Sequence, residues 1–201
     1  MQRKVERERS TKETKIKISL NIDGSGETNI NTGIGFLDHM LELFAFWGHF
    51  DLMILTSKAD LKVDIHHTNE DVGIVLGQAF KEALGDKVGI QRNGFASFPM
   101  ENVTANVTVD ISGRGSFTWP LSGSGVAPDK KEGYEFEYAE HFLDALSKNI
   151  GMNLTITVAG SSPDLHTTLE PIFKALGKAL DQATQIDPRR KGVPSTKGII
   201  D

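Results

Sequence analysis

The 201-residue sequence contains no cysteine, so it can form neither a disulfide framework nor a thiolate metal site. No apolar run is long enough to span a bilayer. The charged first nine residues lack the apolar segment of a secretory signal. A net charge of -5 argues against nucleic acid as the main partner, and 38% hydrophobic residues are enough for a substantial core. We therefore expect a cytoplasmic enzyme that binds neither nucleic acid nor a membrane.

Histidine is also scarce, yet five of the six histidines fall in a repeated arrangement. Residues 66–83 match residues 166–183 at seven of eighteen positions, where average composition would give about one match. Each copy opens with a histidine that is followed four positions later by a glutamate. These pairs are His66 with Glu70 and His166 with Glu170. The sequence therefore predicts an internal repeat.

The spacing within each copy indicates metal binding. Residues i and i+4 lie on one face of a helix, and imidazole nitrogen with carboxylate oxygen suits Mn, Fe or Zn. His67 would point about 100° away from His66, which favours two neighbouring metal centres over one. A further histidine precedes each copy, His39 by 27 residues and His141 by 25. A single histidine on an apolar helix is usually an ordinary core or surface residue, but the set of five predicts a metal site.

Hydrophobic periodicity predicts an α+β fold. The predicted strands are 15–22, 27–31, 51–57, 61–65, 103–111, 116–120 and 153–158. The predicted helices surround His39 and His141 and cover 70–84 and 170–184, while 121–133 is predicted to be an exposed loop. The expected architecture is one domain, 1–201, of two pseudo-repeated ββαβ(β)α halves, 1–93 and 94–186. Their helices would pack on one face of mixed four-stranded sheets. The basic tail, 187–201, is either solvated or an anion-binding flap.

Several motifs, in this order and spacing, resemble those of one family. They cover residues 9–14, 32–40, 64–71, 83–87, 99–100, 110–114, 173–175 and 194–198. The most specific are the block that begins at His66 and the block Pro-Ser-Thr-Lys-Gly at 194–198. Together the motifs resemble imidazoleglycerol-phosphate dehydratase, a family of histidine biosynthesis, and the resemblance covers nearly the whole chain.

The resemblance implies a hydro-lyase that converts imidazole glycerol phosphate to imidazole acetol phosphate. It implies a fold like that of ribosomal protein S5 domain 2, two Mn²⁺ ions per site, and a homo-oligomer of 24 subunits with sites between chains. The implied metal ligands are His39, His66, His67, Glu70, His141, His166 and Glu170. The implied catalytic carboxylates are Glu13, Glu70 and Glu170. The implied phosphate-binding residues are Arg92, Arg114, Lys174, Ser195 and Lys197.

The chemistry of this reaction agrees with those residues. No carbonyl flanks the C–H bond that must break, so the elimination needs another electron sink. An imidazole held as its anion by two metal ions can supply one. A carboxylate can then move the protons, and the resemblance favours Glu13 for that task.

The second copy departs from the family pattern at Thr167, where the family has a second histidine. A hydroxyl is a poor ligand for Mn²⁺ beside imidazole. Three interpretations stay open: an active or weakened dehydratase, a diverged metal-dependent enzyme for another phosphorylated heterocycle, and an inactive member that binds metal and assembles. The retained histidines and Glu13 favour the first, whereas Thr167 favours the third.

Overall fold

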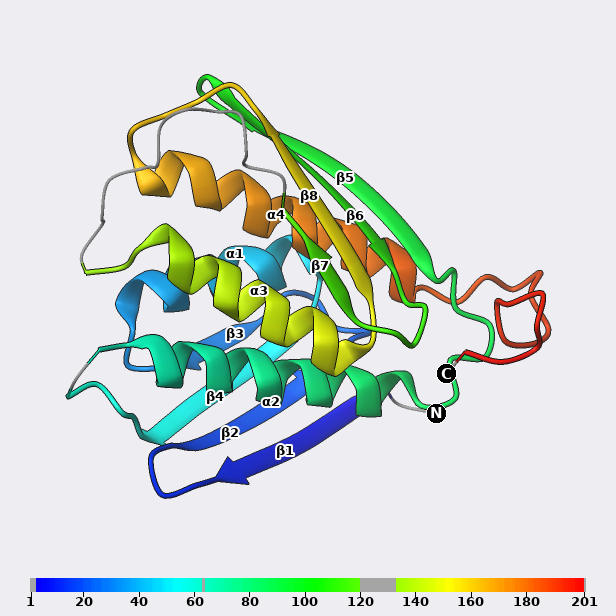
Figure 1. The fold of residues 1–201 in the computed structure, drawn as a ribbon. Coiled ribbons are helices and arrows are strands. Elements are labelled where there is room, and N and C mark those ends of the chain that lie inside the picture. Colours follow the sequence, from blue (N-terminus) through cyan, green and yellow to red (C-terminus); the bar gives the residue numbers. More distant parts are fainter. Residues whose placement is uncertain (1–2, 63, 120–132, 201) are drawn as a thin grey trace.

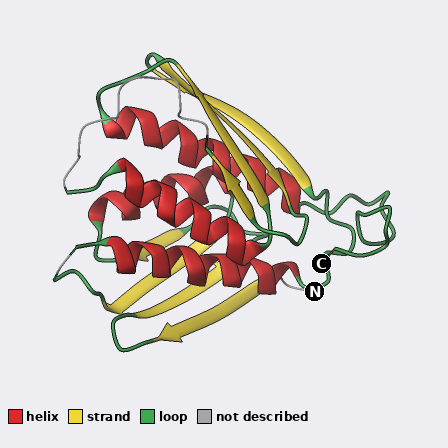
Figure 2. Cartoon of the chain, in the orientation of Figure 1, coloured by secondary structure: helices red, strands yellow, loops and turns green. Residues whose placement is uncertain are grey.

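Two four-stranded sheets enclose a layer of helices. The computed structural model describes residues 3–62, 64–119 and 133–200. Over these residues the sheets lie on opposite sides of the molecule and the helices pack between them (Figure 1, Figure 2). Helix α2 packs against one sheet and α4 against the other, while α1 contacts α4 and α2 contacts α3.

Both sheets have the same strand order. The first half contains β1 (Lys4–Ser10), β2 (Lys15–Asn21), β3 (Thr28–Asn31), α1 (Gly35–Gly48), β4 (Asp51–Lys58) and α2 (His66–Leu84). The second contains β5 (Asn93–Met100), β6 (Val103–Asp110), β7 (Ser116–Thr118), α3 (Phe136–Ile150), β8 (Asn153–Ala159) and α4 (Leu165–Thr184). The orders are β1-β2-β4-β3 and β5-β6-β8-β7, and in each sheet only the last pair is parallel. The predicted α+β class, with two similar halves and mixed sheets, is confirmed.

Alternation along the central strands decides which sheet face meets the helices. Ile16, Ile18 and Leu20 of β2 are fully buried, while the residues between them are not. Every second residue of β6 from Val103 to Val109 is buried in the same way. Burial of an aliphatic side chain of this size contributes about 1.5–3 kcal/mol, so the polar face of each strand is left for the outside.

Glycines let pairs of helices approach each other closely. A Cβ added at Gly177 of α4 would lie 2.2 Å from the carbonyl oxygen of Phe44 in α1. One added at Gly77 of α2 would lie 2.8 Å from the carbonyl oxygen of Leu146 in α3. The backbones of α1 and α4, and of α2 and α3, are therefore in near contact. These two crossings bring together histidines that are far apart in the sequence.

The structure corrects the predicted ends of two helices. Helix α2 begins at His66, not at 70, and Asp64 accepts a 2.8 Å hydrogen bond from the backbone N–H of His66. Helix α4 begins at Leu165, not at 170, because Asp164 caps it by accepting from the N–H groups of His166 and Thr167. The Asp164 cap satisfies backbone donors that the first turn of α4 leaves without partners.

The predicted strands also need correction. Residues 61–62 and 64–65 lie in a loop, so the strand predicted at 61–65 is wrong. Strand β7 ends at Thr118, short of the predicted 120. Strands β1 and β5 were not predicted; both are edge strands, β1 with no buried residue and β5 with only Gly94 and Ala96 buried. The loop predicted at 121–133 lies outside the described residues except for its last residue.

Candidate metal-binding active site

The first group of possible metal ligands lies where α1 crosses α4. The Nε2 atom of His166 is 2.6 Å from Oε2 of Glu170, and Nε2 of His39 is 3.7 Å from the same oxygen. One ligand atom from each of these three side chains lies within 4.8 Å of the others, a spacing that suits a single ion. We call these residues the His166 cluster.

The charge of Glu170 is fixed by its neighbours. Burial alone would raise the pKa of this carboxyl, but hydrogen bonds from Lys174 and His166 outweigh that effect and lower it. The ammonium of Lys174 pairs with Oε1, one turn along α4. Glu170 is therefore an anion with one oxygen directed at the histidines.

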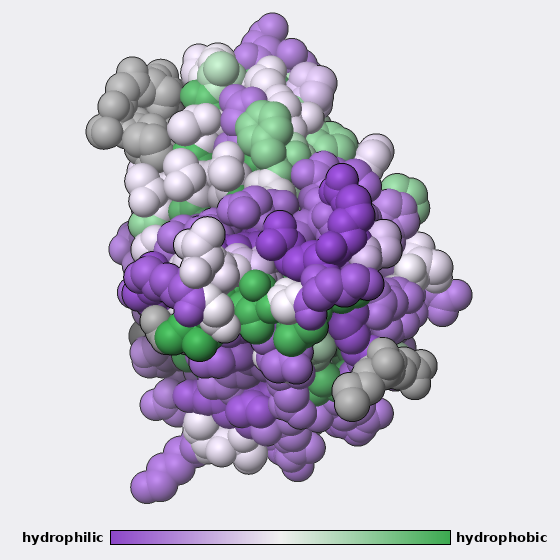
Figure 3. Space-filling model, turned by 90° about the vertical axis from the view of Figure 1, so that its right-hand side faces the viewer, coloured by the Kyte–Doolittle hydropathy of each residue, from purple (hydrophilic) through white to green (hydrophobic). Residues whose placement is uncertain are grey.

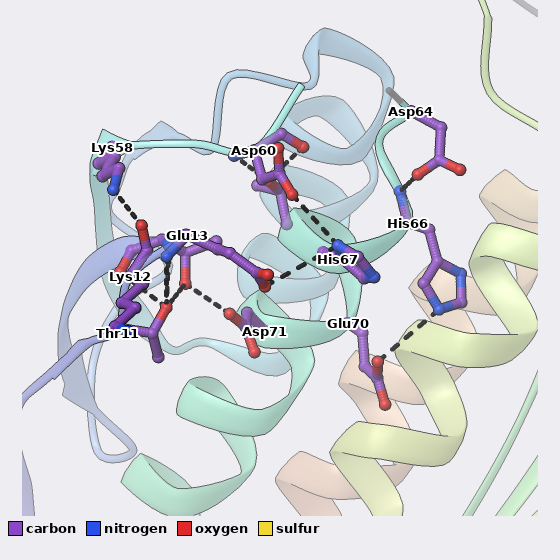
Figure 4. A network of polar contacts seen from close by, with 12 residues as sticks. Thr11, Lys12, Glu13, Lys58, Asp60, Asp64, His66, His67, Glu70 and Asp71 are labelled. Carbon is purple, nitrogen blue, oxygen red and sulfur yellow. Dashed lines mark hydrogen bonds and ion pairs between the residues drawn. The ribbon is translucent and has the colours of Figure 1, made fainter. Parts of the chain in front are cut away.

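The second group lies where α2 meets α3. The Nδ1 atoms of His66 and His141 are 3.0 Å apart, and Nε2 of His66 is 3.8 Å from Oε2 of Glu70. Figure 4 shows the imidazole of His66 and the carboxylate of Glu70 on the same side of α2. These three residues form the His141 cluster, which combines two imidazoles and one carboxylate.

His67 belongs to a third group. Its Nδ1 atom is 3.2 Å from Oδ2 of Asp60 and 3.9 Å from Oε2 of Glu13, and both carboxylates point toward the ring (Figure 4). The hydrogen bond with Asp60 raises the pKa of His67, desolvation opposes this, and the charge of Glu13 adds to the rise. We call this group the His67 cluster. The adjacent histidines 66 and 67 thus serve different clusters.

A cationic pocket lies at the other end of the helices. It has a volume of about 200 Å³, and its lining includes Arg92, Arg114, Ser195 and Lys197. The guanidinium of Arg92 donates to both oxygens of Asp110, at 2.6 and 3.1 Å, and to the carbonyl of Pro194 at 2.9 Å. The tail is thereby tied to the pocket, at an end of the molecule mostly covered by hydrophilic residues (Figure 3).

Comparison with known proteins decides the family. The sequence model of imidazoleglycerol-phosphate dehydratase matches residues 32–180. The chain belongs to the imidazoleglycerol-phosphate dehydratase family. It is 50% identical to the enzyme of that name from Geobacter metallireducens, over 100% of both chains. It is 49% identical to the enzyme from Geobacillus kaustophilus, over 96% of each chain.

Solved structures of the family have the same fold. The dehydratase of Staphylococcus aureus has a TM-score of 0.79 and 33% identity, covering 92% of this chain and 99% of that one. The dehydratase of Pyrococcus furiosus, solved in complex with (S)-C348, has a TM-score of 0.78 and 32% identity, covering 96% of this chain and 99% of that one. The architecture is therefore that of the family over nearly the whole chain.

The structure places the family's expected residues in two regions. The seven expected metal ligands and Glu13 fall in the three clusters. Four of the five expected phosphate-binding residues line the cationic pocket. The exception is Lys174, which pairs with Glu170 beside the His166 cluster. Thr167 is buried in the second copy of the motif and offers no nitrogen or carboxylate ligand.

Sequence reasoning missed two carboxylates at this site. Asp60 contacts His67 from a loop that precedes the helix, so no helical spacing indicates it. Asp71 stands within a motif of the family, but its partners Arg9 and Thr14 lie about 60 residues earlier in the chain. Neither contact has a local sequence signal.

Proposed function

We propose that the chain removes water from imidazole glycerol phosphate to give imidazole acetol phosphate, a step of histidine biosynthesis. The observation that carries this proposal is the gathering of five histidines and three glutamates into clusters on a chain 50% identical to a named dehydratase. The match to that relative extends over the full length of both chains.

The donor set fits a divalent metal, for which we propose Mn²⁺, two ions per site. Imidazole and carboxylate groups suit a metal of this kind. The His166 cluster already has its three ligand atoms within 4.8 Å of one another. We propose as ligands His39, His166, Glu170, His66, His141, Glu70 and His67. When bound, such ions would supply charge stabilisation for an imidazole held as its anion.

We propose Glu13 as the residue that moves protons. Its carboxylate lies 3.9 Å from His67, so it reaches the proposed metal site without leaving the solvent-exposed turn that carries it. Glu70 and Glu170 supply carboxylates to the same region, Glu170 as an anion. Arg114, Ser195 and Lys197, with Arg92 and Lys174, would hold the phosphate through charge-assisted hydrogen bonds.

The distance between the two regions supports sites between chains. The backbone N–H of Arg92 bonds to the carbonyl of Ala183 at the end of α4, whereas His166 lies at its beginning (Figure 1). Seventeen helical residues span about 26 Å. An imidazole joined to a three-carbon phosphate is much shorter, so one chain alone cannot use both regions on one substrate. We propose a homo-oligomer, of 24 subunits as in the family, with the tail 187–201 as a flap over a neighbouring site.

One observation favours a second candidate function. Thr167 leaves the second copy of the motif without its second histidine, and the side chain is buried rather than free to recruit another ligand. A weakened or inactive member that binds metal and assembles is therefore the alternative. The cytoplasmic location stays a prediction of the sequence; none of the described helices is long and apolar enough to cross a membrane.

Turnover of imidazole glycerol phosphate tests the proposal. The purified full chain is stripped with a chelator and assayed with and without added Mn²⁺. We expect turnover to return with Mn²⁺ and to be lost in His166→Asn. The matched control is His49→Asn, the histidine outside the clusters, whose ring lies near Asp181. A folded, metal-loaded chain without turnover would overturn the dehydratase proposal in favour of the alternative.

A further inference from the structure

Asp71 connects α2, the helix that carries His66 and His67, to the turn that carries Glu13. It directly follows Glu70 in α2, and its carboxylate faces the first two strands (Figure 4). One oxygen is 2.6 Å from Nη1 of Arg9, and the other accepts a hydrogen bond from the hydroxyl of Thr14. The Asp71 side chain is only 13% exposed. A charge this far removed from water needs its partners, so the contact is costly to break.

The two partners of Asp71 stand on either side of the turn that carries Glu13. Arg9 belongs to β1, and Thr14 immediately precedes β2. Within the turn, the hydroxyl of Thr11 accepts hydrogen bonds from the N–H groups of Glu13, at 3.1 Å, and Thr14, at 2.9 Å. The N–H of Thr11 donates to the carbonyl of Thr14 at 2.8 Å. The turn is therefore internally fixed and shifts as one unit.

The Glu13 side chain itself has little else to position it. It is 60% exposed, and among the described residues the side chain to which it pairs is that of His67, at 3.9 Å. The place of its carboxylate is thus decided by the backbone of the turn. Because proton transfer depends on placement within a fraction of an ångström, a small shift of the turn is enough to slow it.

We propose that Asp71 is a positioning residue. It holds the carboxylate of Glu13 at a fixed position relative to His67, Asp60 and the proposed metal site. This rests on the proposed role of Glu13 in proton transfer. An ordinary ion pair between strand and helix is the competing account. The chain offers such a pair for comparison: Arg7, two residues before Arg9 in β1, contacts Glu82 near the end of α2 at 3.0 Å.

The test combines Asp71→Asn with Glu13→Gln in the full chain. We expect Asp71→Asn to lower kcat by about 10- to 100-fold, with KM and bound metal per chain little changed. We expect Glu82→Gln to leave kcat unchanged. In the Glu13→Gln background, Asp71→Asn should lower kcat almost no further, since there is no Glu13 carboxylate left to position. An equal loss in both backgrounds, or a loss of bound metal, would overturn the proposal.

A second pair of variants protects the test against misfolding of Asp71→Asn. Thr14→Val removes the hydroxyl that donates to Asp71, together with its 3.3 Å contact to the hydroxyl of Thr11, whereas Thr14→Ser retains the hydroxyl. We expect slow turnover in the first variant and nearly parental turnover in the second. If Glu13→Gln keeps full turnover, the role of Glu13 fails and the positioning role with it. If Glu13→Gln is slow but Asp71→Asn and Thr14→Val are as fast as the parent, only the positioning role fails.

Discussion

The hydroxyl of Tyr134 donates a 2.7 Å hydrogen bond to Oδ1 of Asn69 in a site with almost no exposure to water. The amide of Asn69 in turn donates to the carbonyl of Tyr138 at 2.7 Å. Asn69 belongs to the first turn of α2, one residue before Glu70, while Tyr138 belongs to α3. Burial raises the pKa of Tyr134, so its hydroxyl stays protonated as a donor. This contact holds the two helices of the His141 cluster in place.

Tyr134→Phe should therefore destabilise the protein by about 1–3 kcal/mol, because it leaves a buried oxygen of Asn69 without this donor. The measurement is the free energy of unfolding in denaturant after removal of metal. The double variant with Asn69→Leu is the control, since losing both partners costs less than the sum of the single losses. A Tyr134→Phe protein as stable as the parent would contradict the role of this contact.

Gly177→Ala should push α1 away from α4. The added Cβ would lie 2.2 Å from the carbonyl oxygen of Phe44, so backbone must move. Alanine gains about 1 kcal/mol in helix propensity over glycine, but overpacking of this kind costs about 1–3 kcal/mol or more. We expect a lower Tm and weaker metal binding at the His166 cluster.

The control for that change is Gly35→Ala at the start of α1, where no heavy atom lies within 4 Å of the added carbon. It should leave both Tm and metal affinity nearly unchanged. Equal effects of the two substitutions would show that the close approach of α1 and α4 does not position His39 and His166.

Thr167→His tests whether the missing histidine limits this chain. The Asp164 side chain caps α4 by accepting from the backbone N–H of residue 167, not from its side chain. Helix α4 should therefore still begin in the same place. We expect more bound Mn²⁺ per chain and faster turnover, measured by metal analysis and by steady-state kinetics. Thr167→Ala should change neither. Unchanged metal content in Thr167→His would show that this position does not face a metal centre.

The stability of the fold depends on the ionisation of Asp51. Burial alone would raise the pKa of its carboxyl, but hydrogen bonds from the N–H groups of Ser25 and Glu27 and from Asn21 outweigh burial and hold it below the usual 3.8. The ionised form therefore stabilises the fold above pH 3.8, and this contribution is lost as pH falls through the lower, folded-state pKa. Asp51→Asn should have a lower Tm at pH 6 and a flatter decline of Tm toward pH 2. A parallel decline in both proteins would assign the acid sensitivity to other groups.

Apolar patterns in the sequence indicate some elements of this fold and not others. The central strands β2 and β6 could be predicted because one face of each is buried and their apolar residues alternate. Strand β1 could not, since Val5 is its one aliphatic residue and its Glu side chains pair across to β2 instead, as Glu6 does with Lys17 at 2.9 Å. The start of α4 is set by the Asp164 cap. Apolar periodicity does not indicate this position because the cap is a polar side chain.

The sequence by itself determined the two histidine–glutamate pairs, since four-residue spacing is a local property of a helix, and with them the family and the chemistry of the donors. Only the tertiary structure decided which groups meet. His66 contacts His141 across 75 residues, and His39 reaches Glu170 across 131 residues, because close helix crossings bring them together. It also separated the cationic pocket from the clusters by the length of α4. Contacts of this kind depend on how helices and sheets pack, and local periodicity of the sequence does not specify that packing.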